Sequence, residues 1–223
     1  MRAEHFCHAC GKVQPPVPTD YFAFFGLPRK LDLDVRALEK DFYALSRRLH
    51  PDVYAQSSAR EREWSDEQSS RLNDAYRTLK DPIKRTEYVL KLEGVELEEQ
   101  SKNATEAARA EGKVKKQVVP PALLEEVFEL NMQLEEMRAS KKLGERDPEL
   151  VKELEHQKAG LERKFDGLSH ELKGYWAEWD KLIDKNSAAA ERKPVVDKMV
   201  DLLNRRNYYR NLVRDVNEVL EAS

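Results

Sequence analysis

Two amphipathic segments on either side of the tripeptide His50-Pro51-Asp52 constrain this chain more than any other feature. The apolar residues before the tripeptide fall three or four positions apart, at Val35, Leu38, Phe42, Leu45 and Leu49. That spacing keeps one face of an α-helix apolar. Pro51 must end the helix, because proline lacks a backbone N–H and restricts the residue before it to extended geometry. The pattern predicts a helix that stops at a charged loop.

A second helix follows that loop. Its apolar residues are Leu72, Ala75, Tyr76 and Leu79, and Asp81-Pro82 ends it by the same rule. A short aromatic helix at residues 21–25, capped by Thr19 or Asp20, precedes the pair and is expected to pack across its base. We therefore expect a four-helix unit in which two antiparallel helices hold the loop at their tip.

Composition limits the remaining possibilities. Charged residues make up 36% of the 223 residues and only 8 are glycine, so alternating strands with glycine-rich turns are not expected and the fold class is predicted as all-α. A net charge of −3 argues against a nucleic-acid binder with a broad basic surface. No apolar run approaches the roughly 20 residues that cross a membrane. We expect a cytoplasmic protein with no membrane partner.

Cys7 and Cys10 form a Cys-x-x-Cys pair followed by Gly11. Such a pair supplies two of the four ligands of tetrahedral zinc. His5 and His8 are too close in sequence to complete the site around one ion. Three interpretations stay open: a partial zinc site completed by residues before Met1 or by a second chain, a redox pair, or a tail with reduced thiols.

Residues 120–223 are predicted to form an antiparallel bundle of three helices, after a connector at 94–119. The first of these helices has a core stripe at Leu123, Val127, Leu130, Leu134 and Met137. Two helices carry apolar residues beyond what one seam needs: Leu124, Phe128 and Met132 on the first, and Tyr208 and Leu212 on the last. Such a flank must be covered by another surface or remain in water.

The helix–loop–helix resembles the J domain of DnaJ-type co-chaperones. The resemblance rests on Arg47-Arg48 before the His50-Pro51-Asp52 loop, on the segment 72–79, and on Asp81-Pro82. The flanking segments 20–27 and 85–94 are similar to HscB, the J protein of iron–sulfur cluster assembly, which fungi call Jac. The domains are then 1–17 (Cys-x-x-Cys segment), 18–93 (J domain), 94–119 (linker) and 120–223 (bundle).

The HscB resemblance implies partners and sites. His50, Pro51, Asp52, Arg47 and Arg48 would bind a DnaK/HscA-type chaperone and stimulate its ATPase. Leu124, Phe128 and Tyr208 would bind the scaffold protein IscU. The chemistry would belong to the chaperone, and the sequence has no nucleophile–base pair or phosphate-binding glycine loop to indicate an enzyme.

Two other functions stay open. A general DnaJ-type co-chaperone would deliver unfolded clients and would not bind IscU. A metal or redox protein would depend on Cys7 and Cys10, with the helices serving only as a scaffold. Pull-downs against IscU and HscA with Phe128→Ala and Asp52→Asn separate these possibilities.

Overall fold

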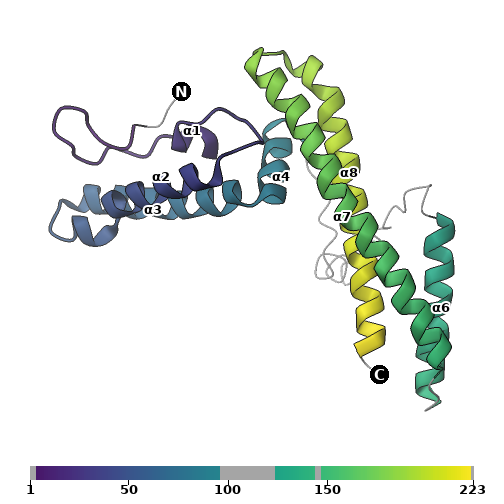
Figure 1. The fold of residues 1–223 in the computed structure, drawn as a ribbon. Helices are drawn as coiled ribbons and strands as arrows, with labels where there is room; N and C mark the ends of the chain where they lie inside the picture. Colours follow the sequence, from purple (N-terminus) through teal and green to yellow (C-terminus); the bar gives the residue numbers. More distant parts are fainter. Residues whose placement is uncertain (1–3, 96–123, 144–146, 222–223) are drawn as a thin grey trace, which may run out of the picture. The chain divides into compact units, whose positions relative to one another are not determined.

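The computed structural model describes residues 4–95, 124–143 and 147–221. Within these ranges the chain is α-helical apart from turns, irregular segments, a 3-10 helix and one β-bridge between Phe6 and Val13. The predicted all-α fold is confirmed, with a four-helix unit followed by an antiparallel three-helix bundle (Figure 1). No helix in the described ranges has both the length and the apolar composition that a membrane crossing requires.

The described residues separate into two compact units. One contains residues 4–95 together with Tyr175–Val196, and the other contains residues 124–143, 147–174 and 197–221. The helices α7 (Pro148–Asp184) and α8 (Ala189–Glu221) therefore contribute to both. Most of the predicted linker lies outside the described residues, and the predicted domain boundaries stay predictions.

The first unit begins with α1 (Tyr21–Phe25), α2 (Val35–Leu49) and the 3-10 helix η1 (Pro51–Tyr54), and continues with α3 (Ala59–Lys80) and α4 (Pro82–Leu92). Each α-helix begins at a side chain that accepts a backbone N–H, as N-caps do. These caps are Asp20, Asp34, Ser58 and Asp81. Ser58 forms a reciprocal capping box with Glu61.

The pair α2 and α3 lies side by side, with α1 across α3 (Figure 1). Their fully buried residues include Phe22, Leu38, Leu49, Leu72, Ala75 and Leu79. Of the predicted stripe, Val35 is 39% exposed, because it is the first residue of α2 and lies beyond the end of the packed seam. Burial on α2 therefore begins at Leu38, about one turn into the helix.

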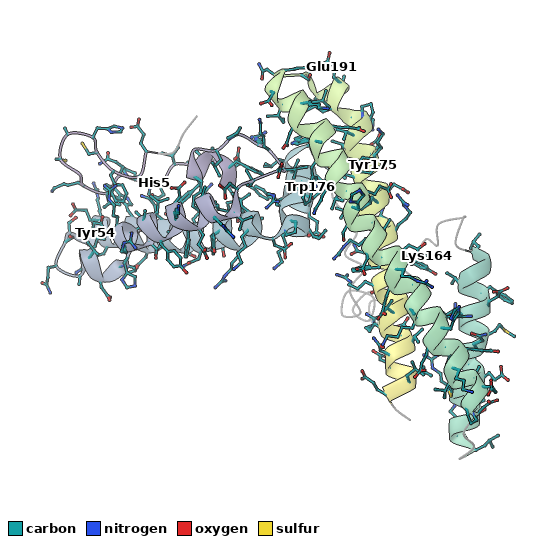
Figure 2. All side chains as sticks on the ribbon, viewed as in Figure 1. His5, Tyr54, Lys164, Tyr175, Trp176 and Glu191 are labelled. Carbon is teal, nitrogen blue, oxygen red and sulfur yellow. The ribbon has the colours of Figure 1, made fainter. Side chains whose placement is uncertain are left out.

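The turn between α7 and α8 also belongs to the first unit. Asp180 accepts the backbone N–H groups of Leu31 and Asp32 at 2.7 and 3.0 Å, and Trp179 donates its indole N–H to the Arg29 carbonyl at 2.8 Å. Burial raises the pKa of the Asp180 carboxyl. Trp176, labelled in Figure 2, donates its indole N–H to Thr86 at 3.0 Å. Hydrogen bonds thus hold the last turns of α7 to the first four α-helices.

In the second unit, α6 (Leu124–Lys142) packs beside α7, and α8 packs beside α7 as well (Figure 1). Gln133 on α6 donates to Glu153 on α7 at 3.2 Å, and Arg205 on α8 pairs with Glu171 on α7 at 3.0 Å. The core contains Leu130 and Met137 from α6, Leu154 and Leu161 from α7, and Leu202 and Val216 from α8.

Candidate functional site

The His50-Pro51-Asp52 loop lies at the end of α2. His50 has extended backbone geometry (φ −61°, ψ 131°), as expected before a proline, and Pro51 opens η1. The Asp52 side chain is 91% exposed and the His50 side chain is 54% exposed. The chain therefore presents a carboxylate and an imidazole to solvent at the point where α2 ends.

A local hydrogen bond indicates which His50 nitrogen carries the proton of the neutral ring. The backbone N–H of Asp52 donates to His50 Nδ1 at 3.3 Å, so Nδ1 accepts and Nε2 carries the proton of a neutral ring. The Asp52 carboxylate lies 3.5 Å from the same Nδ1. In this neutral ring Nδ1 has no proton to donate, so it forms no hydrogen bond with the carboxylate. The carboxylate keeps its hydrogen-bonding capacity for another molecule.

Two side chains that the sequence did not single out brace this loop. Ser65 on α3 is fully buried and donates its hydroxyl to the Leu49 carbonyl at 2.7 Å, satisfying a carbonyl at the end of α2. Tyr54 donates its hydroxyl to the Arg48 carbonyl at 3.0 Å, and burial raises the pKa of Tyr54. Figure 2 labels Tyr54 at this end of the helical pair. The loop is exposed but held at both ends.

Arg47 and Arg48 occupy the last turn of α2, where cations are favoured by the negative end of the helix dipole. Both are exposed. The guanidinium carbon of Arg48 lies 3.7 Å from the centroid of the Phe6 ring, within the range of a cation–π interaction. The structure thus brings all five predicted chaperone-binding residues to one tip.

The N-terminal segment forms a small hairpin beside this tip. Cys7 donates its backbone N–H to the Lys12 carbonyl and Gly11 donates to the Cys7 carbonyl, both at 2.8 Å. Gly11 adopts φ +72°, a left-handed geometry that a side chain would strain. The hairpin is built around the Cys-x-x-Cys turn, which the sequence located without predicting that it docks on the helices.

The hairpin presents two thiols. The backbone N–H groups of Cys10 and Ala9 lie at the Cys7 sulfur and lower the pKa of that thiol. Among the described residues, no group of three or more potential ligands is arranged to hold a metal ion. His5 bonds instead to Gln68 and to the Phe24 carbonyl, and His8 lies 3.6 Å from Glu4. The thiols are thus at most half of a zinc site formed by the described residues.

The helix α6 carries two apolar stripes with opposite environments. Val127, Leu130, Leu134 and Met137 are buried. Leu124, Phe128 and Met132 recur every four residues and are 55%, 68% and 60% exposed. Residues four apart lie on one face of a helix, so these three make a continuous exposed patch, called here the α6 stripe. Exposed apolar patches of this kind are typical of binding surfaces.

Comparisons with known proteins agree with this geometry. The DnaJ domain family matches residues 20–88. The iron-sulfur cluster co-chaperone protein HscB of Mus musculus is 43% identical over 97 residues, which are 43% of this chain and 42% of the relative. The co-chaperone protein HscB homolog of Vibrio cholerae is 47% identical over 78 residues, 35% of this chain and 46% of that relative. The crystal structure of human co-chaperone protein HscB covers 98% of this chain and 91% of its own, with a TM-score of 0.59 at 23% identity.

Residues 20–88 match the DnaJ domain family, and the chain is similar in sequence to HscB co-chaperones. The resemblance inferred from residues 20–27, 47–52 and 72–94 is confirmed. The matched segments span about half the length of the two sequence relatives.

The structure corrects one predicted binding residue. Tyr208 was expected on an exposed flank of α8, but it is only 4% exposed, and Leu212 is only 6% exposed. Burial raises the pKa of the Tyr208 phenol to about 12, with the Asp215 carboxylate adding to the shift. The apolar residues that α8 has beyond its seam pack inside the protein, so Tyr208 is a packing residue and offers no docking surface.

Proposed function

We propose that this protein is a co-chaperone of iron–sulfur cluster assembly. It binds an IscU-type scaffold through the α6 stripe and stimulates the ATPase of a DnaK/HscA-type chaperone through the His50-Pro51-Asp52 loop. Sequence similarity supports this proposal, since the curated relatives are named as HscB co-chaperones. The observation that carries it is the Asp52 carboxylate, which is 91% exposed on a loop braced by Ser65 and Tyr54.

On the chaperone side, the exposed carboxylate of Asp52 pairs with an arginine of the partner in a charge-assisted hydrogen bond. Arg47 and Arg48 complement an acidic surface beside it. The loop raises the rate of ATP hydrolysis only if it binds the hydrolysing conformation of the chaperone more tightly than the other. His50 then needs no acid–base role, because the chemistry occurs in the partner.

An ATPase measurement tests the chaperone contact. Asp52→Asn keeps the size of the side chain but removes the charge, and a hydrogen bond to a charged group contributes about 1.5–3 kcal/mol. We expect the concentration for half-maximal stimulation to rise by about tenfold or more. Asp74→Asn, a change at another exposed aspartate on α3, is the matched control. Stimulation by Asp52→Asn equal to wild type, with the control also normal, would refute the proposal.

On the scaffold side, Phe128 is the central and most exposed member of the α6 stripe. Aromatic residues at the centre of an interface commonly cost about 2 kcal/mol or more when truncated. We expect Phe128→Ala to weaken IscU binding by about thirtyfold in titration calorimetry. Glu129→Ala, an exposed neighbour on the same helix, is the control and should bind like wild type.

The same calorimetry distinguishes a general co-chaperone. An unfolded model client and IscU are titrated separately into the wild-type protein. Tight binding of IscU with no binding of the client supports the scaffold-specific function. Binding of the client alone would overturn it in favour of delivery of unfolded proteins.

Zinc at Cys7 and Cys10 stays a prediction. The hairpin suits the role of half a site, because its backbone N–H groups at the Cys7 sulfur favour the thiolate that binds metal. The remaining ligands must come from outside the described residues. Metal analysis of the wild-type protein and of Cys7→Ser is the test. Wild-type protein purified without chelators that contains no zinc would end this prediction.

A further inference from the structure

The N-terminal hairpin is attached to the J domain by buried contacts. The ring of His5 lies between the Gln68 side-chain oxygen, at 2.6 Å from Nδ1, and the Phe24 carbonyl, at 2.9 Å from Nε2. The Gln68 amide donates in turn to the Gln14 carbonyl at 2.7 Å, and Val13 is 1% exposed. Figure 2 labels His5 where the hairpin meets the helices. These contacts give the hairpin a defined position.

That position places Phe6 against the tip that the proposed function assigns to the chaperone. The Phe6 ring lies under the Arg48 guanidinium at 3.7 Å, and the β-bridge ties the Phe6 backbone to the buried residue Val13. Lys12 on the same hairpin lies 3.6 Å from Glu61 in the first turn of α3. The hairpin thus contacts the helices on both sides of the His50-Pro51-Asp52 loop.

Holding Arg48 has an energetic consequence. A free arginine side chain loses rotamer freedom when a partner binds it, and that loss opposes binding. A guanidinium stacked on an aromatic ring keeps its N–H groups directed along its edge, where a carboxylate can accept two of them. Phe6 therefore reduces the ordering that chaperone binding requires of Arg48.

We propose that Phe6 is a positioning residue for chaperone binding. It orients Arg48 for an acidic surface of the ATPase partner, and the hairpin of residues 4–14 is a working part of the chaperone-binding face. This inference rests on the proposed function, because it concerns the same tip. It adds a residue 46 positions away in sequence from Asp52 to that surface.

The hairpin and α2 also border a common hollow. Its volume is about 620 Å³, and its lining includes Phe6 and Cys7 from the hairpin and Leu45 and Arg48 from α2. Arg48 thus has the ring on one side and open space on another. An acidic side chain of the partner can reach the guanidinium from that hollow without displacing Phe6.

The test is ATPase stimulation of a DnaK/HscA-type chaperone, measured against the concentration of full-length protein. Phe6→Ala and Phe6→Leu remove the aromatic ring, and Phe6→Trp keeps one. We expect the first two to raise the half-maximal concentration about three- to fivefold, with maximal stimulation unchanged. Phe6→Trp should restore the wild-type value. Circular dichroism confirms that each variant is folded, and zinc content is measured in parallel because Cys7 adjoins the changed residue.

A double-mutant cycle identifies the route of the effect. If Phe6 acts through Arg48, Phe6→Ala has no further effect in an Arg48→Ala background but retains its effect in an Arg47→Ala background. An equal effect in both backgrounds would overturn the inference, and so would wild-type behaviour of folded Phe6→Leu. Absence of stimulation by the wild-type protein would instead overturn the proposed function, so the two failures are distinguishable.

Discussion

The first and last helices of the bundle carry the same sequence signal with opposite structural outcomes. In α6, Phe128 lies beside the seam and is 68% exposed. In α8, Tyr208 lies beside the seam and is 4% exposed. Both helices have more apolar side chains than one seam can cover, but the protein covers the surplus only in α8.

This contrast separates two meanings of a surplus apolar flank. A helix pattern reports that a flank needs a partner surface, because apolar area in water is unfavourable by about 25 cal/mol per Å². The pattern does not report whether that surface is in the same chain. In α8 the partner is internal and the flank contributes to stability. In α6 the flank is exposed and is available for binding.

Unfolding free energies give the largest expected difference between the two helices. Tyr208→Ala removes a buried aromatic side chain and should lower the free energy of unfolding by about 3–5 kcal/mol. Phe128→Ala should change it by less than about 0.5 kcal/mol, because the removed ring is mostly in water. Urea denaturation followed by circular dichroism measures both. Similar losses of unfolding free energy in the two variants would show that α6 and α8 do not differ in how they cover their apolar flanks.

The stability of the protein at alkaline pH tests whether Tyr208 on α8 is buried. The pKa of Tyr208 is about 12 in the folded protein, while tyrosine in an unfolded chain ionises near pH ~10. The folded state therefore holds this proton more tightly, so the stabilisation is complete below pH ~10 and is lost as the pH rises through ~12. Wild-type protein should lose more unfolding free energy over this window than Tyr208→Phe. Equal losses would mean that Tyr208 ionises freely in the folded state.

The affinity for IscU tests whether the exposed α6 stripe is a binding surface. Met132 is the next member of the stripe after Phe128 and is 60% exposed. Met132→Ala should weaken IscU binding by about 1 kcal/mol, roughly fivefold, in the same calorimetry. Its stability should match the wild type. A variant that binds normally would restrict the binding surface to the start of α6.

The smallest expected effect concerns the tip of the J domain. Asp52→Asn should change the free energy of unfolding by less than about 0.5 kcal/mol, because the carboxylate is almost fully in solvent. Thermal unfolding of the variant and of wild type measures this. A large loss would mean that Asp52 contributes to stability, as buried Tyr208 does, and would weaken its assignment to binding.

Much of the first unit could be predicted because its signals are local. Proline at 51 and at 82 ends α2 and α3, and aspartates at 20, 34 and 81 begin helices through hydrogen bonds within three residues. The apolar flank that α6 has beyond its seam was also anticipated from its spacing. The role of Tyr208 was not, because burial of an α8 flank depends on parts of the chain distant in sequence.

Contacts between segments distant in sequence could not be predicted either. No periodicity relates Phe6 to Arg48, Ser65 to Leu49, or Asp180 to Leu31, since each pair depends on how separate elements pack. The hairpin of residues 4–14 has no hydrophobic repeat, so the sequence did not predict that it docks beside the His50-Pro51-Asp52 loop.

The sequence by itself determined where most helices of the J domain begin and end, that the His50-Pro51-Asp52 loop interrupts them, and that two helices have apolar residues to spare. Only the tertiary structure decided which of those residues reach solvent and which side chains support the loop. The physical reason is the sequence separation over which each kind of interaction acts. Capping, proline geometry and helical periodicity act within a few residues, whereas burial and cation–π contacts depend on distances between segments that the chain brings together only when folded.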